Sequence, residues 1–161
     1  MSAEIVTLVD VNDHEIGAAP RARVRKEGLI HRVCYILVFN AEDQLLLQKR
    51  TSIKDLYPGY YDAAAGGVLL AGESYDVSAQ RELQEELGIS APMKTHFDHY
   101  FDDGFNRYWG RVYSCRHEGP FKLQASEVQS VEFVDIAQIL DGQFSPLTSD
   151  TMEVLNKWLE Y

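Results

Sequence analysis

The sequence has no long hydrophobic run and no excess of basic residues. No stretch of consecutive apolar residues approaches the ~18 that a membrane-spanning helix needs. The first residues, MSAEIVTLVDVNDHE, lack the basic segment and the apolar stretch of a secretory signal. We therefore expect a soluble cytoplasmic protein that has no membrane partner.

Cysteine is also scarce, and the charge balance is acidic. Cys34 and Cys115 lie in separate apolar stretches and form no CxxC pair, so we expect buried free thiols and no zinc or redox motif. The formal net charge of −10 does not attract a nucleic-acid backbone, so no nucleic-acid partner is expected. The same charge repels small anions unless a cation is recruited locally.

The chain shows no internal repeat or linker, which predicts a single domain over residues 1–161. An alternating pattern with a polar NDH turn predicts a hairpin within an N-terminal extension of about residues 1–27. We expect a basic, irregular connection at residues 21–32. Residues 51–67 are rich in Pro, Gly and Tyr and predict a long loop, a type of segment that is usually functional.

The remaining segments predict a mixed architecture. In residues 74–87, Ala79, Leu83 and Leu87 recur at helical spacing, and Gly88 follows as a stop. Strands are expected at residues 33–39, 45–50, 95–101, 107–115 and 128–134. Two short helices are expected at the end, with Asp135 and either Ser149 or Asp150 as N-caps. Strands on both sides of a central helix predict an α/β sandwich around a mixed β-sheet.

Three carboxylates lie within five residues of the predicted central helix. At 100° per residue, Glu85 and Glu86 fall about 60° and 40° to either side of Glu82, so all three share one face. Like charges at this spacing destabilise a helix by a few tenths of a kcal/mol each. Mg²⁺ and Mn²⁺ prefer such oxygen ligands. A metal site is one interpretation, and a solvated acidic helix face is the other.

These carboxylates belong to a longer motif. Gly67 is followed by five residues, Glu73, seven residues and the run RELQEELGI at residues 81–89. This matches the Nudix box at every position, and on this motif the chain is identified as a member of the Nudix hydrolase family. The segments HRVCYILVFNAEDQLLLQKR, YPGYYDAAAGG and EVQSVEFVDIAQI resemble the branch close to isopentenyl-diphosphate isomerase.

The resemblance implies a Nudix fold, an α/β/α sandwich with a mixed sheet, and metal-dependent hydrolysis of a nucleoside diphosphate linked to another group X. The partner is then a small-molecule diphosphate, and the cofactor is Mg²⁺ or Mn²⁺. Glu73 and Arg81 are implied as a pair that holds the loop against the helix. The implied metal ligands are Glu82, Glu85, Glu86 and the backbone carbonyl of Gly67.

The chemistry is consistent with this resemblance. A bound divalent cation reverses the local charge, bridges phosphate oxygens and lowers the pKa of a bound water. Three carboxylates are candidates to accept the proton of the attacking water, namely Glu82, Glu85 and Glu127. Glu127, in the loop before the last predicted strand, equally fits a surface acid.

Basic and aromatic residues outside the motif are candidates for substrate contacts. Lys49 and Arg50 close a predicted strand near the long loop, and Arg107 and Arg111 flank Trp109. Each could hold outer phosphates or lie on a solvated face. Two roles are possible for the aromatic residues, which could stack on a nucleobase or cover the hydrophobic core. These residues are Tyr57, Tyr60, Tyr61 and Trp109.

Two alternative functions remain open. The isomerase needs a cysteine, closely followed by a histidine, near the start of the motif, but here the segment is AAAGGV and Val68 takes the histidine position. Only His31 matches an isomerase ligand position. A non-catalytic nucleotide sensor is the other alternative, although such domains often lose carboxylates that this chain keeps. The identity of X, the number of metals and the choice between monomer and homodimer stay open.

Overall fold

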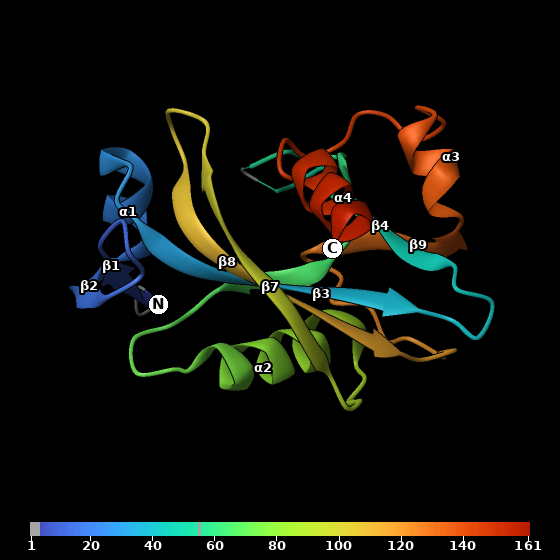
Figure 1. The fold of residues 1–161 in the computed structure, drawn as a ribbon, viewed down its shortest axis with the longest axis horizontal. Coiled ribbons are helices and arrows are strands. Elements are labelled where there is room, and N and C mark those ends of the chain that lie inside the picture. The colour runs from blue at the N-terminus through green and yellow to red at the C-terminus, as the bar shows by residue number, and fades with distance from the viewer. Residues whose placement is uncertain (1–3, 55) are drawn as a thin grey trace.

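The computed structural model describes residues 4–54 and 56–161. A mixed sheet of nine strands forms the centre, with helices on both of its faces (Figure 1). Residues 1–3 of the predicted N-terminal extension, and Asp55 in the predicted long loop, lie outside the described residues.

β3 (His31–Phe39) is the central strand. It pairs in parallel with β8 (Arg107–Arg116) and antiparallel with β6 (Ala65–Val68). Its residues from Cys34 to Phe39 are buried, which confirms the prediction of a strand covered on both faces. The other strands are β1 (Ile5–Val9), β2 (Glu15–Pro20), β4 (Leu45–Arg50), β5 (Tyr61–Asp62), β7 (Lys94–Asp102) and β9 (Val128–Val134).

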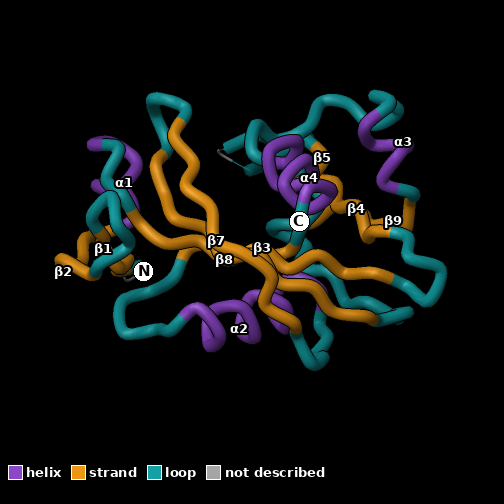
Figure 2. The backbone as a smooth tube through the Cα atoms, in the orientation of Figure 1, coloured by secondary structure: helices purple, strands orange, loops and turns teal. Residues whose placement is uncertain are grey.

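The helices lie on opposite faces of the sheet, as Figure 2 shows in purple. α2 (Tyr75–Leu87) covers one face, and α3 (Ile136–Leu140) and α4 (Thr151–Glu160) cover the other. One hydrophobic cluster joins the sheet to α2, and a second joins it to α3 and α4. This arrangement confirms the predicted α/β/α sandwich. None of the helices in the described ranges is long and apolar enough to cross a membrane.

The sequence pattern of α2 is confirmed in detail. Ser74 caps its N-terminus by accepting a hydrogen bond from the Val77 N–H at 3.1 Å, and Ala79, Leu83 and Leu87 are fully buried. Gly88 ends the helix in the left-handed conformation, with φ of 66°. The buried stripe fixes the rotation of the helix about its axis and therefore the direction in which its carboxylates point.

Two predictions of irregular structure were wrong. The basic segment expected to be an irregular connection contains the helix α1 (Arg21–Glu27), which follows Pro20 and ends at Gly28 with φ of 62°. Val24 is the only buried residue of this helix, so no periodic apolar stripe could reveal it. The predicted long loop contains the short strands β5 and β6.

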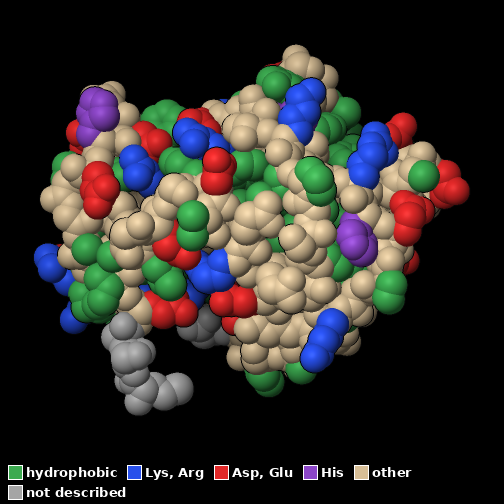
Figure 3. Space-filling view, turned by 90° about the horizontal axis from the view of Figure 1, so that it is seen from below, with side chains coloured by type: hydrophobic (Ala, Val, Ile, Leu, Met, Phe, Trp, Pro, Cys, Tyr) green, Lys and Arg blue, Asp and Glu red, His purple; other side chains and the backbone are tan. Residues whose placement is uncertain are grey.

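The cysteine prediction is confirmed, since Cys34 and Cys115 are both buried and free. The face of the molecule that carries α2 is seen in Figure 3, where acidic and basic side chains lie interspersed. The acidic net charge therefore does not form a continuous single-sign surface on this face.

Candidate active site

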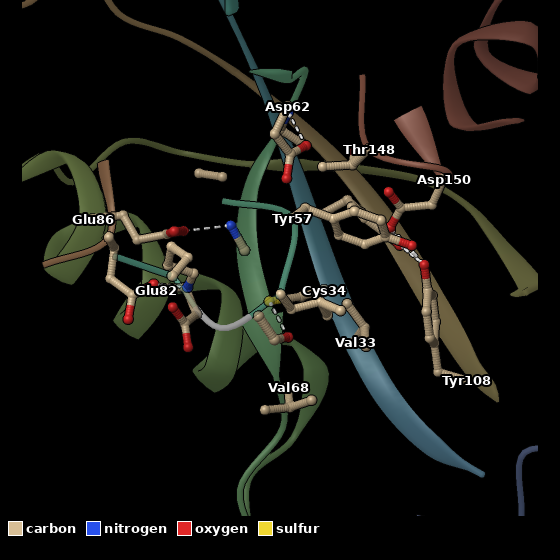
Figure 4. A pocket seen from close by; sticks show the side chains of 18 of the residues that line it. Val33, Cys34, Tyr57, Asp62, Val68, Glu82, Glu86, Tyr108, Thr148 and Asp150 are labelled. Atoms are coloured by element: carbon tan, nitrogen blue, oxygen red, sulfur yellow. Dashed lines mark hydrogen bonds and ion pairs between the residues drawn. The ribbon is translucent and has the colours of Figure 1, made fainter. Parts of the chain in front are cut away.

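A cavity of about 440 Å³ lies beside β3 and β6. Its volume falls in the range of small-molecule binding sites. α1, α2 and the ends of several strands contribute to its wall. Figure 4 shows Glu82 and Glu86 on one side of this cavity and Asp62, Thr148 and Asp150 on the other.

The three carboxylates of α2 all line this cavity, as their shared helix face predicts. The side chain of Glu82 is only 14% exposed, whereas that of Glu85 is 47% exposed. Glu86 is partly buried and accepts a hydrogen bond from the Gly66 N–H at 2.7 Å. The helix therefore presents two partly buried carboxylates and one exposed carboxylate to the same space.

Arg81 donates hydrogen bonds to three carboxylates of the motif. Its Nε and Nη2 donate to the two oxygens of Glu73 at 2.7 and 2.9 Å, a bidentate pair of the strong kind. Its Nη1 donates to Glu82 at 2.9 Å and to Glu85 at 3.1 Å. Glu73 also accepts the Leu70 N–H at 2.8 Å, so the pair joins the loop after β6 to α2. Although burial opposes the change, the hydrogen bonds from Arg81 lower the pKa of Glu73.

The inner carboxylates carry poorly compensated charge. Burial raises the pKa of Glu82 to about 7, and the neighbouring charge of Glu85 adds to this effect while Arg81 opposes it. Burial, followed by the charge of Glu82, raises the pKa of Glu86 to about 8. A cation placed between these groups would stabilise their charged forms.

Gly67 lies close to this cluster. A Cβ atom added at this position would lie 2.8 Å from Oε1 of Glu82, which is closer than real Cβ contacts. The absence of a side chain therefore leaves room for the Glu82 carboxylate. The neighbouring Gly66 is more constrained, because a Cβ there would lie 1.9 Å from the carbonyl oxygen of Cys34.

The donor set fits a hard divalent cation in its chemistry, because it consists of carboxylate oxygens and a nearby backbone carbonyl. In residues 4–54 and 56–161, however, no group of three or more Asp, Glu, His or Cys side chains is arranged so that it could hold a metal ion. In the present arrangement Glu82 and Glu85 are bonded to Arg81, and Glu86 to Gly66. Metal binding would require these carboxylates to exchange partners.

The two substrate contacts predicted on β4 differ in whether they line the cavity. Arg50 lines the cavity, whereas Lys49 does not. Successive side chains of a strand point to opposite faces, so Gln48 and Arg50 face the cavity. The Lys49 ammonium instead lies 5.6 Å from the centre of the Tyr61 ring. Glu127 lines the cavity and forms an ion pair with Lys54.

Other candidates have structural roles. Arg111 donates to Asp98 at 2.7 Å and lies over the ring of Tyr75, away from the cavity. His31 lines the cavity but is 5% exposed and contacts the Leu29 carbonyl through Nδ1 at 3.0 Å. Burial lowers the pKa of His31. Of the four aromatic candidates, only Tyr57 lines the cavity.

Several lining residues were missed from the sequence. Arg21 and Arg25 reach the cavity from α1. Asp150 was expected as a helix cap, but its side chain makes no capping bond and instead accepts hydrogen bonds from Tyr35 and from Tyr108, the latter at 2.6 Å. No local motif marks these residues, because the fold brings them together from distant segments.

Comparisons with known proteins show the family to which this chain belongs. A family model described as NUDIX domain matches residues 29–155. The chain is 42% identical over 160 residues to the uncharacterized Nudix hydrolase PA4841 of Pseudomonas aeruginosa, covering 98% of this chain and 95% of that protein. The crystal structure of DR0079 from Deinococcus radiodurans superposes with a TM-score of 0.80 at 23% identity, covering 96% and 98% of the two chains.

A further solved structure is the NUDIX domain of Shewanella oneidensis NrtR complexed with ADP ribose. It has a TM-score of 0.64 at 19% identity and covers 80% of this chain and 86% of that one. At these identities both solved structures support the fold. The chain belongs to the NUDIX domain family, and it is a Nudix hydrolase, an enzyme of the class that cleaves a nucleoside diphosphate linked to another group X.

Proposed function

We propose that the protein is a divalent-metal-dependent hydrolase that cleaves the pyrophosphate bond of a nucleotide derivative inside the cavity beside α2. The observation that carries the proposal is the position of three α2 carboxylates on the wall of a cavity of about 440 Å³. More acidic than basic side chains line the cavity, and the acidic ones cluster on α2, so a polyanionic diphosphate is repelled there unless a cation is recruited. The required metal is therefore part of the same proposal.

Mg²⁺, or Mn²⁺ in its place, would be held by Glu82, Glu85 and Glu86 together with the carbonyl of Gly67. The cation would supply charge neutralisation for the phosphates and activation of a water molecule. Arg81 and Glu73 would keep the helix and the preceding loop in register, which is a positioning role. Arg50 lines the opposite part of the wall, where its Nη1, which does not donate to the Leu56 carbonyl, would reach the substrate.

Proton transfer needs a carboxylate close to the attacking water. Glu82, Glu85 and Glu127 all line the cavity, so each can be reached by a bound substrate. Glu127 approaches from the loop before β9, and its ion pair with Lys54 keeps its side chain at the wall. The activity of a Glu127→Gln variant therefore tests whether the proton acceptor is Glu127, outside α2, or a carboxylate within the motif.

The first test uses Glu85→Gln and Glu86→Gln with a panel of nucleotides, nucleotide sugars and isopentenyl diphosphate. We expect Mg²⁺-dependent release of nucleotide or phosphate to fall by about 100-fold in each variant, because a charged metal ligand is lost. Burial and the charge of Glu82 raise the pKa of Glu86, so Glu86→Gln should be as stable as the parent, or more stable, in chelator.

Glu132→Gln is the matched control, because Glu132 is an exposed carboxylate on β9 outside the cavity. It should keep full activity. Full activity in both α2 variants would refute the assignment of the site. Cleavage that persists in chelator would refute the metal requirement.

A sensor is the second candidate function. It is favoured by the NrtR NUDIX domain, a protein of the same fold that was solved with ADP ribose. For this chain, a sensor would bind a nucleotide derivative tightly without turnover in any metal. Calorimetric binding together with silence across the substrate panel would support it over the hydrolase.

A further inference from the structure

We infer that the wall of the cavity opposite the α2 carboxylates binds the group X through its hydroxyl groups, so that X is a sugar or a similar polyol and not a further phosphate. This inference rests on the proposed function and specifies its substrate class. The wall, here called the polar floor, consists of Gln48, Asp62 and Asp150 with the hydroxyl groups of Tyr35 and Tyr108.

Gln48 points most directly to a ligand. It is 4% exposed and lines the cavity from β4. Its carboxamide makes no hydrogen bond with any residue in the part of the chain that the structure describes. Buried polar groups are almost always hydrogen-bonded. A buried carboxamide that faces a cavity and has no protein partner is therefore a donor and acceptor available to a ligand.

Asp62 stands beside Gln48 on the same face of the sheet. The two residues are directly paired across β4 and β5, and side chains of such a pair project to the same side. Asp62 Oδ1 accepts the Ala64 N–H at 3.2 Å. Its Oδ2 is 3.8 Å from Nη1 of Arg50, which is beyond hydrogen-bond range. Asp62 therefore keeps acceptor capacity toward the cavity.

Asp150 completes the floor from the start of α4. Its Oδ2 accepts hydrogen bonds from the hydroxyl groups of Tyr35 and Tyr108, both of which are buried. Its Oδ1 makes no hydrogen bond with the described residues. Figure 4 shows Asp62 and Asp150 across the cavity from Glu82 and Glu86. The two tyrosines fix the orientation of the carboxylate that faces a ligand.

This set of groups selects between kinds of ligand. Carboxylate oxygens accept hydrogen bonds from hydroxyl groups, whereas they repel phosphate oxygens. The nearest cation, Arg50, donates through Nε and Nη2 to the Leu56 carbonyl at 3.2 and 2.9 Å, and its Nη1 lies 3.8 Å from Asp62, so its positive charge is already shared with a carboxylate of the floor. A polyol, with several adjacent donors, suits the floor, and a terminal phosphate does not.

The nucleobase end of the substrate would bind at the mouth of the cavity. Phe105 and Leu56 line the cavity and are 83% and 38% exposed, so they lie at its mouth. An apolar rim of this kind suits the flat face of a nucleobase. The base would therefore lie at the mouth, the diphosphate beside α2 and X on the polar floor.

The test compares kcat and KM for two sugar substrates, ADP-ribose and UDP-glucose, with those for ATP, all with Mg²⁺. Gln48→Leu and Asp62→Asn should each raise KM for the sugar substrates about tenfold, as expected for a lost hydrogen bond, with kcat nearly unchanged. The KM for ATP should not move.

Gln129→Leu is the matched control, because Gln129 is an exposed glutamine on β9 outside the cavity. Thermal unfolding of each variant checks the fold, and the isosteric Asp62→Asn serves if Gln48→Leu does not fold. Three results would overturn the inference without affecting the hydrolase assignment. They are an equal rise in KM for ATP, an unchanged KM for the sugar substrates, and a preference of the wild-type protein for ATP.

Calorimetric titration with the non-hydrolysable methylene-bridged analogues of ADP-ribose and ADP, with Mg²⁺, examines the same contact without turnover. The inference requires that ADP-ribose binds more tightly than ADP, and that the difference disappears in Gln48→Leu and Asp62→Asn. If ADP-ribose bound more tightly in this way but no substrate were cleaved, the hydrolase proposal would be refuted and the polyol site would still be supported. Equal affinity for ADP and ADP-ribose would overturn the polyol site.

Discussion

At the scale of single residues, two adjacent glycines have different tasks. Gly66 has φ of 147° and lies against the backbone of β3, so any side chain there would collide with the carbonyl of Cys34. Gly67 meets only the end of the flexible Glu82 side chain. The first glycine therefore serves the packing of the sheet, and the second leaves room for a carboxylate of the candidate site.

This difference predicts opposite behaviour of two alanine variants. Gly66→Ala should lower the free energy of unfolding by about 2 kcal/mol or more, because backbone must move to relieve the clash. Gly67→Ala should unfold within about 0.5 kcal/mol of the parent but lose Mg²⁺-dependent activity, since Glu82 is displaced. Urea unfolding and activity assays measure both effects. A stable, inactive Gly66→Ala protein would contradict the distinction.

The residues of the motif could be predicted from the sequence because they are close together and belong to one helix. Helical geometry alone places Glu82, Glu85 and Glu86 on one face. Gln48 and Asp62 could not be found in this way, because their proximity depends on the register between β4 and β5. The sequence could not separate Lys49 from Arg50, because only the fold defines which side of β4 faces the cavity.

At the scale of elements, α2 carries both the core and the candidate site. Its buried stripe packs against the sheet while the adjoining face lines the cavity. Local signals were sufficient to predict it, namely a cap, a stripe and a terminal glycine. α1 has a terminal glycine, Gly28, but it lacks a side-chain cap and a buried stripe, because it is short and buries only Val24. β5 is two residues long and depends on its pairing partners, which local sequence does not encode.

The cap of α2 gives a prediction at this scale. Ser74→Ala removes the acceptor of the Val77 N–H, so the free energy of unfolding should fall by about 1 kcal/mol. Ser90→Ala, at an exposed position just beyond the helix, is the control and should be nearly neutral. Chemical denaturation of the two variants in parallel provides the comparison, and equal stabilities would show that the cap does not stabilise α2.

At the scale of the whole molecule, buried histidines link stability to pH. His99 is 1% exposed, and neither of its ring nitrogens has a hydrogen-bond partner among the described residues. Burial, with a smaller effect from Lys157, lowers its pKa to about 4. Burial also lowers the pKa of His31 and His96. All three therefore favour the folded state only while they are neutral.

The sign of the pH effect follows from proton uptake. The unfolded chain binds a proton at His99 near pH 6.5 and the folded chain only near pH 4, so stability falls as pH falls between these values. From pH 7 to pH 5 the loss from this residue alone should be about 2 kcal/mol. Glu82 and Glu86 act in the opposite direction, because their pKa values are raised.

The contribution of His99 is therefore measured as a difference between proteins. The stability of the parent relative to His99→Leu should decrease by about 2 kcal/mol between pH 7 and pH 5, measured by urea unfolding in chelator. The carboxylates are common to both proteins and cancel. Parallel pH profiles would mean that His99 is not neutral in the folded protein.

Residues from near both ends of the described chain line the cavity. Arg21 reaches it from α1 near the N-terminus and Asp150 from the start of α4 near the C-terminus, while the motif lies in the middle. A premature stop codon late in the reading frame would thus yield a product with every motif carboxylate and an incomplete substrate pocket. During divergence after gene duplication, substitutions in α1 and at the start of α4 can change substrate choice while residues 67–89 preserve the chemistry.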